Sequence, residues 1–324
     1  MDKKQPAYGG QAVIEGVMMG GKHTTVTAVR LKDHSIEYYE CPKRSFPLVN
    51  MLKKIPFIRG IVGILEASAL GTKHLNFASD AYDAGPKDRS SINSEEQKKT
   101  SNAGLIIGIA IIGVLSFIFA KFVFTIVPAV IADLFKPIAI FRGQTSQILL
   151  EGFFKVILLL GYIYFVSLTP LMKRVFQYHG AEHKVINAFE NDVPLTVENV
   201  QKQSRLHYRC GSSYILFTAI ISIALYFFVP IYPLWLRLIY RILLIPVDLG
   251  IAYEVLRFTN KLRHIPVLKW LGYPGLWLQL LTTKEPEPKQ IEVAICAFEE
   301  MRKRDAIYEK SQVNLNSLKV NKGV

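Results

Sequence analysis

Four long, mostly apolar stretches dominate the hydropathy pattern of the chain. The first, Gly104–Ala132, is interrupted by a single charge at Lys121 and contains Pro128, where we expect a kink. Three more stretches follow it: Val156–Met172, Gly211–Leu236 and Leu238–Leu256. About 20 apolar residues, each adding about 1.5 Å, suffice to cross a hydrocarbon core of about 30 Å. The pattern therefore predicts four membrane-spanning helices.

The basic residues lie mainly between these stretches and indicate the orientation of the spans. Lys and Arg number 15 in residues 1–102, 6 in residues 173–210 and 12 in residues 257–324, against only 2 in residues 133–152. Because basic loops are retained in the cytosol, both termini and the 173–210 connection are expected inside. The alternative is that residues 238–256 lie on the surface or re-enter, which would put the C-terminus outside against its charge bias.

The polar segments before the first span predict a small cytosolic head, residues 1–83. Residues 24–32 and 35–41 alternate in the way that is typical of a β-hairpin, and the glycine-rich segment 9–16 precedes them. Ile55–Gly71 is apolar but carries charges, which favours an interfacial or bundle-packed helix over a span. A flexible linker is expected next, because residues 84–102 are rich in Ser, Lys and Glu.

The membrane domain is expected to cover residues 103–264, with residues 173–210 as a cytosolic loop. Residues 265–304 combine an aromatic segment suited to the headgroup boundary with an amphipathic helix from Gln290 to Arg304. The apolar face of this helix consists of Ile291, Ala294, Ile295 and Phe298. Residues 305–324 read as a polar tail. The predicted fold class is a mainly α-helical integral membrane protein with four transmembrane helices and a small cytosolic α/β N-terminal head.

Composition excludes several classes of protein. Half of the 324 residues are hydrophobic and 20% are charged, which argues against disorder and against an ordinary soluble enzyme. The net charge of +13 follows the expected topology and comes without an aromatic-basic reading motif, so nucleic acid is not expected as a partner. Cys41, Cys210 and Cys296 are far apart, which excludes a disulfide scaffold and suits thiols facing a cytosol.

The candidate chemistry lies in the 173–210 loop, which contains the sequence His-Gly-Ala-Glu-His. His179 and His183 are four residues apart, so on a helix both rings project from one face and can share a cation. Glu182 completes the H-x-x-E-H pattern, in which the histidines hold zinc and the glutamate transfers a proton. The alternative is a structural helix whose histidines hydrogen-bond to carboxylates or lipid phosphates.

A catalytic zinc needs a third protein ligand. His207 and Cys210 precede the third span and are the preferred candidates, followed by Glu254 near the cytosolic end of the fourth. All of these residues are expected at the inner membrane boundary. Taken singly, each also has an ordinary structural explanation: an interfacial histidine, a packed thiol, and a carboxylate paired with Arg257.

Two further features are candidates for function. Arg241 and Asp248 are seven residues apart in the fourth stretch, and an intramembrane charge pair either serves a function or fixes the bundle. With only one such pair, the structural role is preferred. Glu15 lies among glycines in a segment that could form a site loop near the membrane, although the spacing of a phosphate-binding loop is absent.

Long strings of the sequence resemble the YqhQ family of bacterial membrane proteins across about residues 7 to 300. The strings are Gly9–Met19, His179–Lys184, Arg209–Ser213, Leu281–Pro286 and Ile291–Ala294. Ser212 stands where threonine is expected, a change that should leave a metal site intact. The resemblance implies an uncharacterised multi-pass protein of the bacterial plasma membrane, in a family described as predicted metal-dependent enzymes.

These observations lead to three hypotheses of function. The first is a metal-dependent hydrolase that acts on a membrane-associated substrate, with zinc held by His179 and His183 and with Glu182 as general base. The second is a transporter or lipid-handling protein whose path is lined by charges of the fourth span, which would require a homo-oligomer. The third is a scaffold in the lipid bilayer whose metal is structural.

Overall fold

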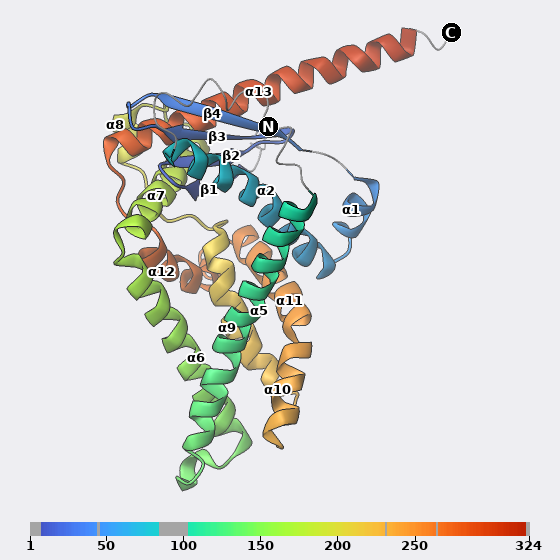
Figure 1. Cartoon of the computed structure of the whole chain (residues 1–324), viewed down its shortest axis with the longest axis vertical. Helices are drawn as coiled ribbons and strands as arrows, with labels where there is room; N and C mark the ends of the chain where they lie inside the picture. Colours follow the sequence, from blue (N-terminus) through green and yellow to red (C-terminus); the bar gives the residue numbers. More distant parts are fainter. Residues whose placement is uncertain (1–7, 44–45, 84–102, 231, 264, 322–324) are drawn as a thin grey trace.

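The head of the molecule is built on an antiparallel sheet, and long helices extend from it to the opposite end (Figure 1). The computed structural model describes residues 8–43, 46–83, 103–230, 232–263 and 265–321. Four strands form the sheet in the order β1-β2-β3-β4, with bounds Gly9–Val13, Gly16–Gly20, Thr24–Arg30 and Ile36–Pro42. The predicted hairpin is confirmed as β3 and β4. The glycine-rich segment before it is a second hairpin rather than a loop.

Helices surround the sheet and form the rest of the molecule. Those of the N-terminal half are α1 (Pro47–Leu52), α2 (Ile58–Asp83), α5 (Ala103–Leu134), α6 (Gln144–Ser167) and α7 (Pro170–Glu190). Those of the C-terminal half are α8 (Val197–Gln201), α9 (Gly211–Tyr226), α10 (Leu234–Leu243), α11 (Ile245–Lys261), α12 (Tyr273–Thr282) and α13 (Pro288–Asn321). Single 3-10 turns cover Ala139–Phe141 and Leu268–Gly272.

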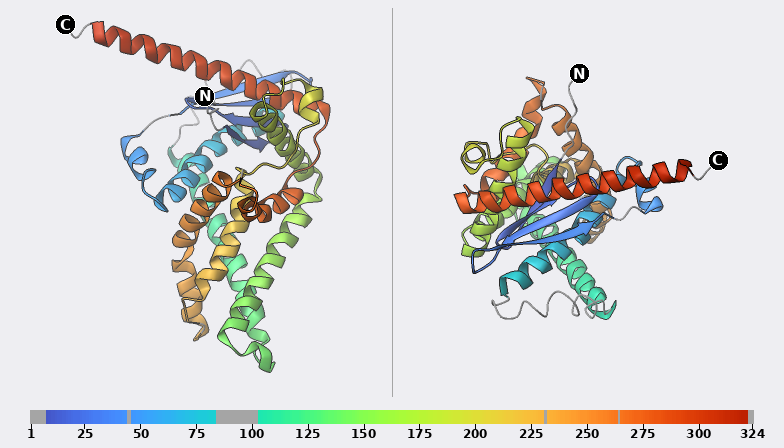
Figure 2. Two further views of the ribbon diagram at one scale, coloured as in Figure 1. Left: turned by 180° about the vertical axis from the view of Figure 1, so that it is seen from behind. Right: turned by 90° about the horizontal axis from the view of Figure 1, so that it is seen from above.

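Both faces of the sheet are covered, which explains why almost every residue of β3 is buried. Val26 and Ala28 point to one face, where they share a core with residues of α7 and α13. Thr25 and Thr27 point to the other face, where their hydroxyls hydrogen-bond the ring of His74 in α2. Seen from above, α13 crosses the sheet (Figure 2). Because side chains alternate along a strand, β3 packs against α7 and α13 on one face of the sheet and against α2 on the other.

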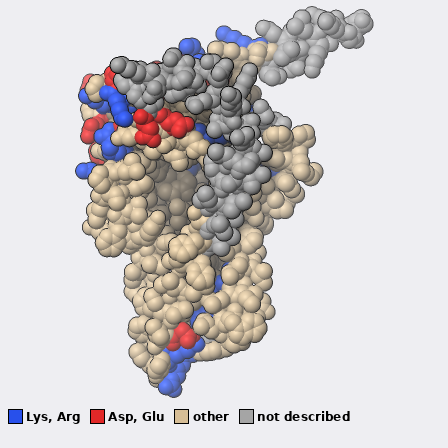
Figure 3. All heavy atoms as spheres, in the orientation of Figure 1, with Lys and Arg blue, Asp and Glu red and all other residues tan. Residues whose placement is uncertain are grey.

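One helix in the described part of the chain, α6, is long and apolar enough to cross a membrane by itself. Phe122–Leu134 and α9 are shorter apolar helical stretches. Charged side chains gather around the sheet and at the opposite tip, and uncharged side chains cover most of the surface between them (Figure 3). Beyond its first two residues, the exposed side chains of α6 are large, and most are apolar, including Phe153, Ile157 and Phe165.

The structure moves several predicted helix boundaries. The second apolar stretch was expected over Val156–Met172, but α6 begins at Gln144 and ends at Ser167. The next helix, α7, starts at Pro170, where a missing N–H costs nothing in a first turn. The third stretch, expected to reach Leu236, ends as α9 at Tyr226. The fourth is divided at Leu244 into α10 and α11, since Pro246 cannot donate to the preceding turn.

The C-terminal helix confirms one prediction and extends beyond it. Its predicted apolar face is buried against the sheet and α7, with Ile291, Ala294 and Phe298 fully enclosed. However, the residues expected as a polar tail continue the same helix to Asn321. Asp305 helps to hold the start of this extension against the head, because its carboxylate accepts hydrogen bonds from backbone N–H groups of the turn after β2. The predicted linker over residues 84–102 lies outside the described residues.

Candidate metal centre

The two motif histidines and Cys210 lie together where α7 meets the start of α9. One nitrogen of His179, one nitrogen of His183 and the Cys210 Sγ atom are all within 4.8 Å of one another, so these side chains could hold a metal ion. The rings of the two histidines are 4.5 Å apart, as expected for residues one helical turn apart. Of the three predicted candidates for a third ligand, the structure brings Cys210 into this cluster.

Backbone carbonyls fix the orientation of both histidine rings. His179 Nδ1 is 2.9 Å from the carbonyl oxygen of Thr282, and His183 Nδ1 is 2.6 Å from that of Arg205. A carbonyl only accepts hydrogen bonds, so each Nδ1 carries the proton and each Nε2 keeps its lone pair. His179 Nε2 in turn lies 3.2 Å from Cys210 Sγ. This is the arrangement in which histidines bind metals, with the second ring nitrogen held by a carbonyl.

Cys210 owes its position to the first turn of α9. It is the N-cap residue, and its Sγ accepts the backbone N–H of Ser212 at 3.4 Å. The Ser212 hydroxyl is 3.0 Å from the same sulfur and accepts a hydrogen bond from the Thr282 hydroxyl. Thr282 therefore contacts the cluster twice, through its carbonyl to His179 and through its hydroxyl to Ser212. The sulfur is buried in the protein and faces the histidines.

Glu182 lies beside the cluster without belonging to its ligand group. Its side chain is buried against β1, where the backbone N–H of Gly10 donates to the carboxylate. Burial raises the pKa of Glu182, while the nearby His179 and the Gly10 N–H act in the opposite direction. A carboxylate whose pKa is moved toward neutrality is a better proton acceptor for catalysis near pH 7.

Two glycines of the long sequence strings allow this close packing. A Cβ atom at Gly10 would lie 3.1 Å from the Glu182 carboxyl group and would overlap a neighbouring carbonyl. A Cβ atom at Gly180 would overlap the carbonyl oxygen of Lys284, in the segment that follows Thr282. Both glycines therefore let a backbone segment approach the face of α7 that carries the histidines.

His207 lies beside His183 but does not belong to the cluster of possible ligands. Its ring is 5.7 Å from that of His183, and its Nε2 is 3.6 Å from a carboxylate oxygen of Glu190. The Gln279 side chain holds the His207 backbone from both sides, accepting from its N–H and donating to its carbonyl, each at 2.8 Å. Burial lowers the pKa of His207, although the neighbouring Glu190 carboxylate acts in the opposite direction, so the ring is neutral at pH 7.

Comparison with known proteins identifies the family of the chain. Residues 55–304 match the family model described as "Protein of unknown function (DUF1385)". The chain belongs to this family. It is also 60% identical over 310 residues, 96% of each chain, to "Uncharacterized protein YqhQ" of Bacillus subtilis (strain 168). No solved structure matches the chain.

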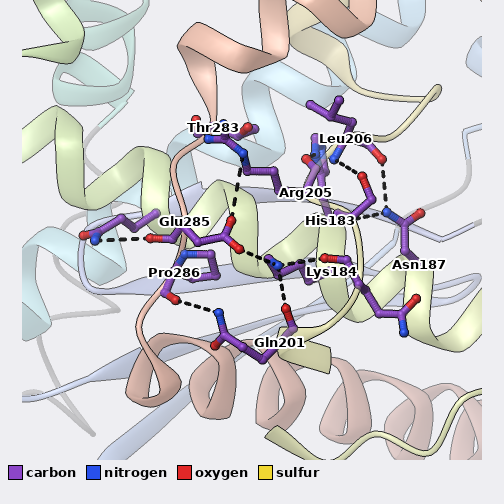
Figure 4. Close-up of polar contacts among 12 residues, drawn as sticks. His183, Lys184, Asn187, Gln201, Arg205, Leu206, Thr283, Glu285 and Pro286 are labelled. Carbon is purple, nitrogen blue, oxygen red and sulfur yellow. Dashed lines mark hydrogen bonds and ion pairs between the residues drawn. The ribbon is translucent and has the colours of Figure 1, made fainter. Parts of the chain in front are cut away.

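In this DUF1385 protein, α7 also anchors the two segments that carry the carbonyl acceptors (Figure 4). The Lys184 ammonium group, 3% exposed, donates to the carbonyls of Gln201 and Gln203 and pairs with Glu285 at 2.8 Å. Asn187 donates to the carbonyls of Ser204 and Leu206. These bonds hold residues 201–206 and 283–286 against α7, so they position the carbonyls that orient the histidines.

The other predicted site residues lie elsewhere in this DUF1385 protein. Glu254 forms an ion pair with Arg59 and accepts from the Phe57 N–H, so it does not contact the histidine cluster. Glu15 has a left-handed backbone (φ 51°) in the β1–β2 turn, and its carboxylate pairs with Arg174 of α7. It thereby fastens the head to the helix that carries the motif.

The main partner of Arg241 is Glu151, which lies outside the apolar stretches predicted as spans. Both Arg241 and Arg237 donate to the carboxylate of Glu151 in α6, and all three side chains are fully buried. Asp248 lines the same cavity as Arg241, which has room for about one water molecule, about 10 Å³. The signal was present, since Glu151 introduces a charge into an apolar helix.

Proposed function

We propose that this protein is a metal-dependent hydrolase of the bacterial plasma membrane. His179, His183 and Cys210 would hold one divalent ion, and zinc is the ion that a set of two nitrogens and one sulfur favours. The observation that carries the proposal is the orientation of the histidines, each with Nδ1 on a backbone carbonyl and Nε2 left as the ligand atom. A purely structural helix has no need of this arrangement.

The geometry of the donor atoms fits an ion with little movement. Zinc–sulfur and zinc–nitrogen bonds of about 2.0–2.3 Å in a tetrahedral site separate the ligand atoms by about 3.5 Å. His179 Nε2 and Cys210 Sγ are already 3.2 Å apart, and the three ligand atoms lie within 4.8 Å. Three protein ligands leave the fourth position for water, as in catalytic rather than structural zinc sites.

The roles of the residues follow from their surroundings. A bound zinc ion lowers the pKa of its water toward neutrality and supplies the nucleophile for hydrolysis. Glu182, buried beside His179 and with a raised pKa, would accept the proton of that water. The His207 ring is neutral and lies beside the His183 ring. This position suits a residue in the wall of the site better than a metal ligand.

We also propose that four spans place this site at the cytosolic membrane face. The spans would be α5, α6, α9 and the consecutive helices α10 and α11. The apolarity of α6, the uncharged belt between head and tip, and the lysine and arginine bias of the sequence support this arrangement. The substrate would then reach the site from the membrane or its surface.

The test uses the residue whose role differs between a catalytic and a structural metal. Glu182→Gln keeps the shape and hydrogen bonding of the side chain but removes the base. We expect wild-type metal content and thermal stability, together with a loss of function in cells as complete as that of the deletion, since a lost general base costs about 10²–10⁴ in rate. His179→Ala, His183→Ala and Cys210→Ser should each abolish metal binding.

His207→Ala is the matched control for the ligand set, and it should retain most of the metal. Metal per chain is measured by elemental analysis after purification without chelators. Wild-type protein free of metal would end the proposal of a metal site. A Glu182→Gln protein that holds metal and fully complements the deletion would leave the site intact but exclude the hydrolase, in favour of a structural metal.

A further inference from the structure

A polar pocket opens beside the candidate metal centre. It has a volume of about 420 Å³, within the range of small-molecule sites. Its walls come from the end of α7, the 202–208 segment and the end of α11, and His207 forms part of the lining. The His207 ring separates this pocket from His183, whose ring is 5.7 Å away. A molecule in the pocket would thus lie one side chain from the metal ligands.

Positive charge exceeds negative charge around this pocket. Glu190 carries the central carboxylate, which pairs with both Arg209 and Arg263. Burial opposes its ionisation, but the neighbouring His207 and Arg209 side chains outweigh this effect and lower the pKa of Glu190 to about 2. Lys202 lines the wall and pairs with Glu198 at 2.6 Å. Two cations, Lys202 and Arg263, and one carboxylate, Glu190, therefore line the pocket.

Buried nitrogen atoms at this pocket lack hydrogen-bond partners within the described residues. They are His207 Nε2, which is in the lining, and Arg209 Nε, on a residue that pairs with Glu190 from outside the lining. The His207 side chain is only 5% exposed, and the Glu190 oxygen at 3.6 Å is beyond hydrogen-bond distance. A buried polar group without a partner is costly. Oxygen atoms of an anionic ligand would supply the missing acceptors.

The pocket also lies close to the expected membrane boundary. The Tyr208 ring packs against Gly272, where an added Cβ atom would lie 2.7 Å from it. The same segment exposes Trp270 and Trp277, at 62% and 63% of their surface, as aromatic side chains at the headgroup level do. In the proposed membrane arrangement, the pocket would therefore lie close to the lipid surface.

We propose that this pocket binds a phosphate group of the substrate, with Arg263 and Lys202 as its cationic partners. That the phosphate belongs to a substrate rests on the proposed hydrolase. The pocket itself is built from residues other than the proposed metal ligands. A phosphate monoester or diester provides several acceptor oxygens and suits bidentate arginine contacts. Amide side chains in the same wall, such as Asn187 and Gln203, suit the polar remainder of a headgroup or of a soluble phosphate compound.

The test measures binding of inorganic phosphate to the detergent-purified full chain by calorimetry, with and without prior chelation. We expect binding to persist after chelation, because the cations of the pocket and not the metal hold the anion. Lys202→Gln and Arg263→Gln should each weaken it about tenfold.

Lys303→Gln is the matched control, since Lys303 and Lys202 are similarly exposed, at 69% and 66%, and each pairs with a glutamate of its own helix. It should leave binding unchanged. Equal weakening in Lys202→Gln and Lys303→Gln, or no binding in any variant, would overturn the proposal.

Two lipid environments distinguish the source of the phosphate. In nanodiscs that contain phosphatidylglycerol, a lipid headgroup that enters the pocket should weaken the apparent binding of inorganic phosphate relative to nanodiscs of phosphatidylcholine. Equal binding in both would indicate a soluble phosphate compound. If the chain contained no metal but bound phosphate through Lys202 and Arg263, the proposed phosphate pocket would stand and the proposed hydrolase would be wrong. Phosphate binding that disappears with the metal in His179→Ala would refute the pocket.

Discussion

At the scale of single residues, hydrogen bonds to the backbone determine which atoms are available for chemistry. The carbonyls of Thr282 and Arg205 engage one nitrogen of each motif histidine and leave the other for a ligand. The threonines of β3 have the opposite effect on His74, whose two ring nitrogens lie 2.9 and 2.6 Å from hydroxyl groups. The same residue type thus has one ring nitrogen held by a backbone carbonyl at one place and both ring nitrogens held by hydroxyl groups at another.

The burial of His74 makes the stability of the head depend on pH. Burial lowers the pKa of His74 to about 4, well below the 6.5 of an exposed histidine. Below about pH 6.5 the unfolded chain binds a proton that the folded chain does not, so stability falls as the pH drops from 6.5 toward 4. The full effect is about 3 kcal/mol. We expect thermal midpoints of the wild type to decrease over this range and those of His74→Gln to decrease less.

His34→Asn, in the β3–β4 turn, is the control for this measurement. It removes an exposed histidine at a left-handed position (φ 68°) that asparagine tolerates. The pH dependence of its midpoint should match that of the wild type. If His74→Gln kept the full dependence, another group would have to be responsible.

At the scale of elements, the periodicity of a helix explains how much of the site the sequence could predict. The spacing of His179 and His183 places both rings on one face, and the structure brings them together with Cys210. The carbonyl partners could not be predicted, because Arg205 and Thr282 are 22 and 103 residues from the histidines that they hold. Such contacts depend on tertiary packing, which a local sequence pattern does not reveal.

Charged residues explain where the prediction of elements failed. Glu254 was expected beside the histidines from its place near the end of a span, but Arg59 in α2 lies within reach and pairs with it. The second span was started after Lys155, whereas the helix begins at Gln144 and buries Glu151 between two arginines. A buried ion pair allows an apolar helix to contain a charge, and the hydropathy pattern alone does not show the partner.

The contact between α7 and the segment before α13 gives a prediction at this scale. Gly180→Ala should push the Lys284 backbone away from α7 and displace Thr282 from His179. We expect a loss of about 1–3 kcal/mol in stability, as for overpacking elsewhere, and a lower metal content. Gly161→Ala in α6 is the matched control, since nothing lies within 4 Å of its added Cβ atom. It should stabilise slightly, by about 0.5–1 kcal/mol, and an equal effect of both substitutions would contradict the packing argument.

At the scale of the whole molecule, the distribution of charge separates a polar head from a polar tip. The tip contains Lys136, which pairs with Asp133, and Arg142, which donates to the carbonyls of Lys136 and Pro137. The head contains the sheet, α7, the pocket lined by His207 and the C-terminal helix, and ion pairs such as that of Glu15 with Arg174 fasten the sheet to α7. If the uncharged belt between them lies in a bilayer, the metal centre and the pocket both face the cytosol, where reduced thiols persist.

This arrangement predicts which positions an impermeant reagent can reach in intact cells. Thr145→Cys adds a thiol at an exposed position of the tip, and Lys310→Cys adds one on the exposed surface of α13. An impermeant maleimide should label the first in intact cells and the second only after lysis, because the bilayer shields the head. The wild type, whose three cysteines are all on the expected inner side, should stay unlabelled until lysis. Labelling of Lys310→Cys in intact cells would put the C-terminus outside and would remove α10 and α11 as a span, whereas failure to label Thr145→Cys would remove the external tip.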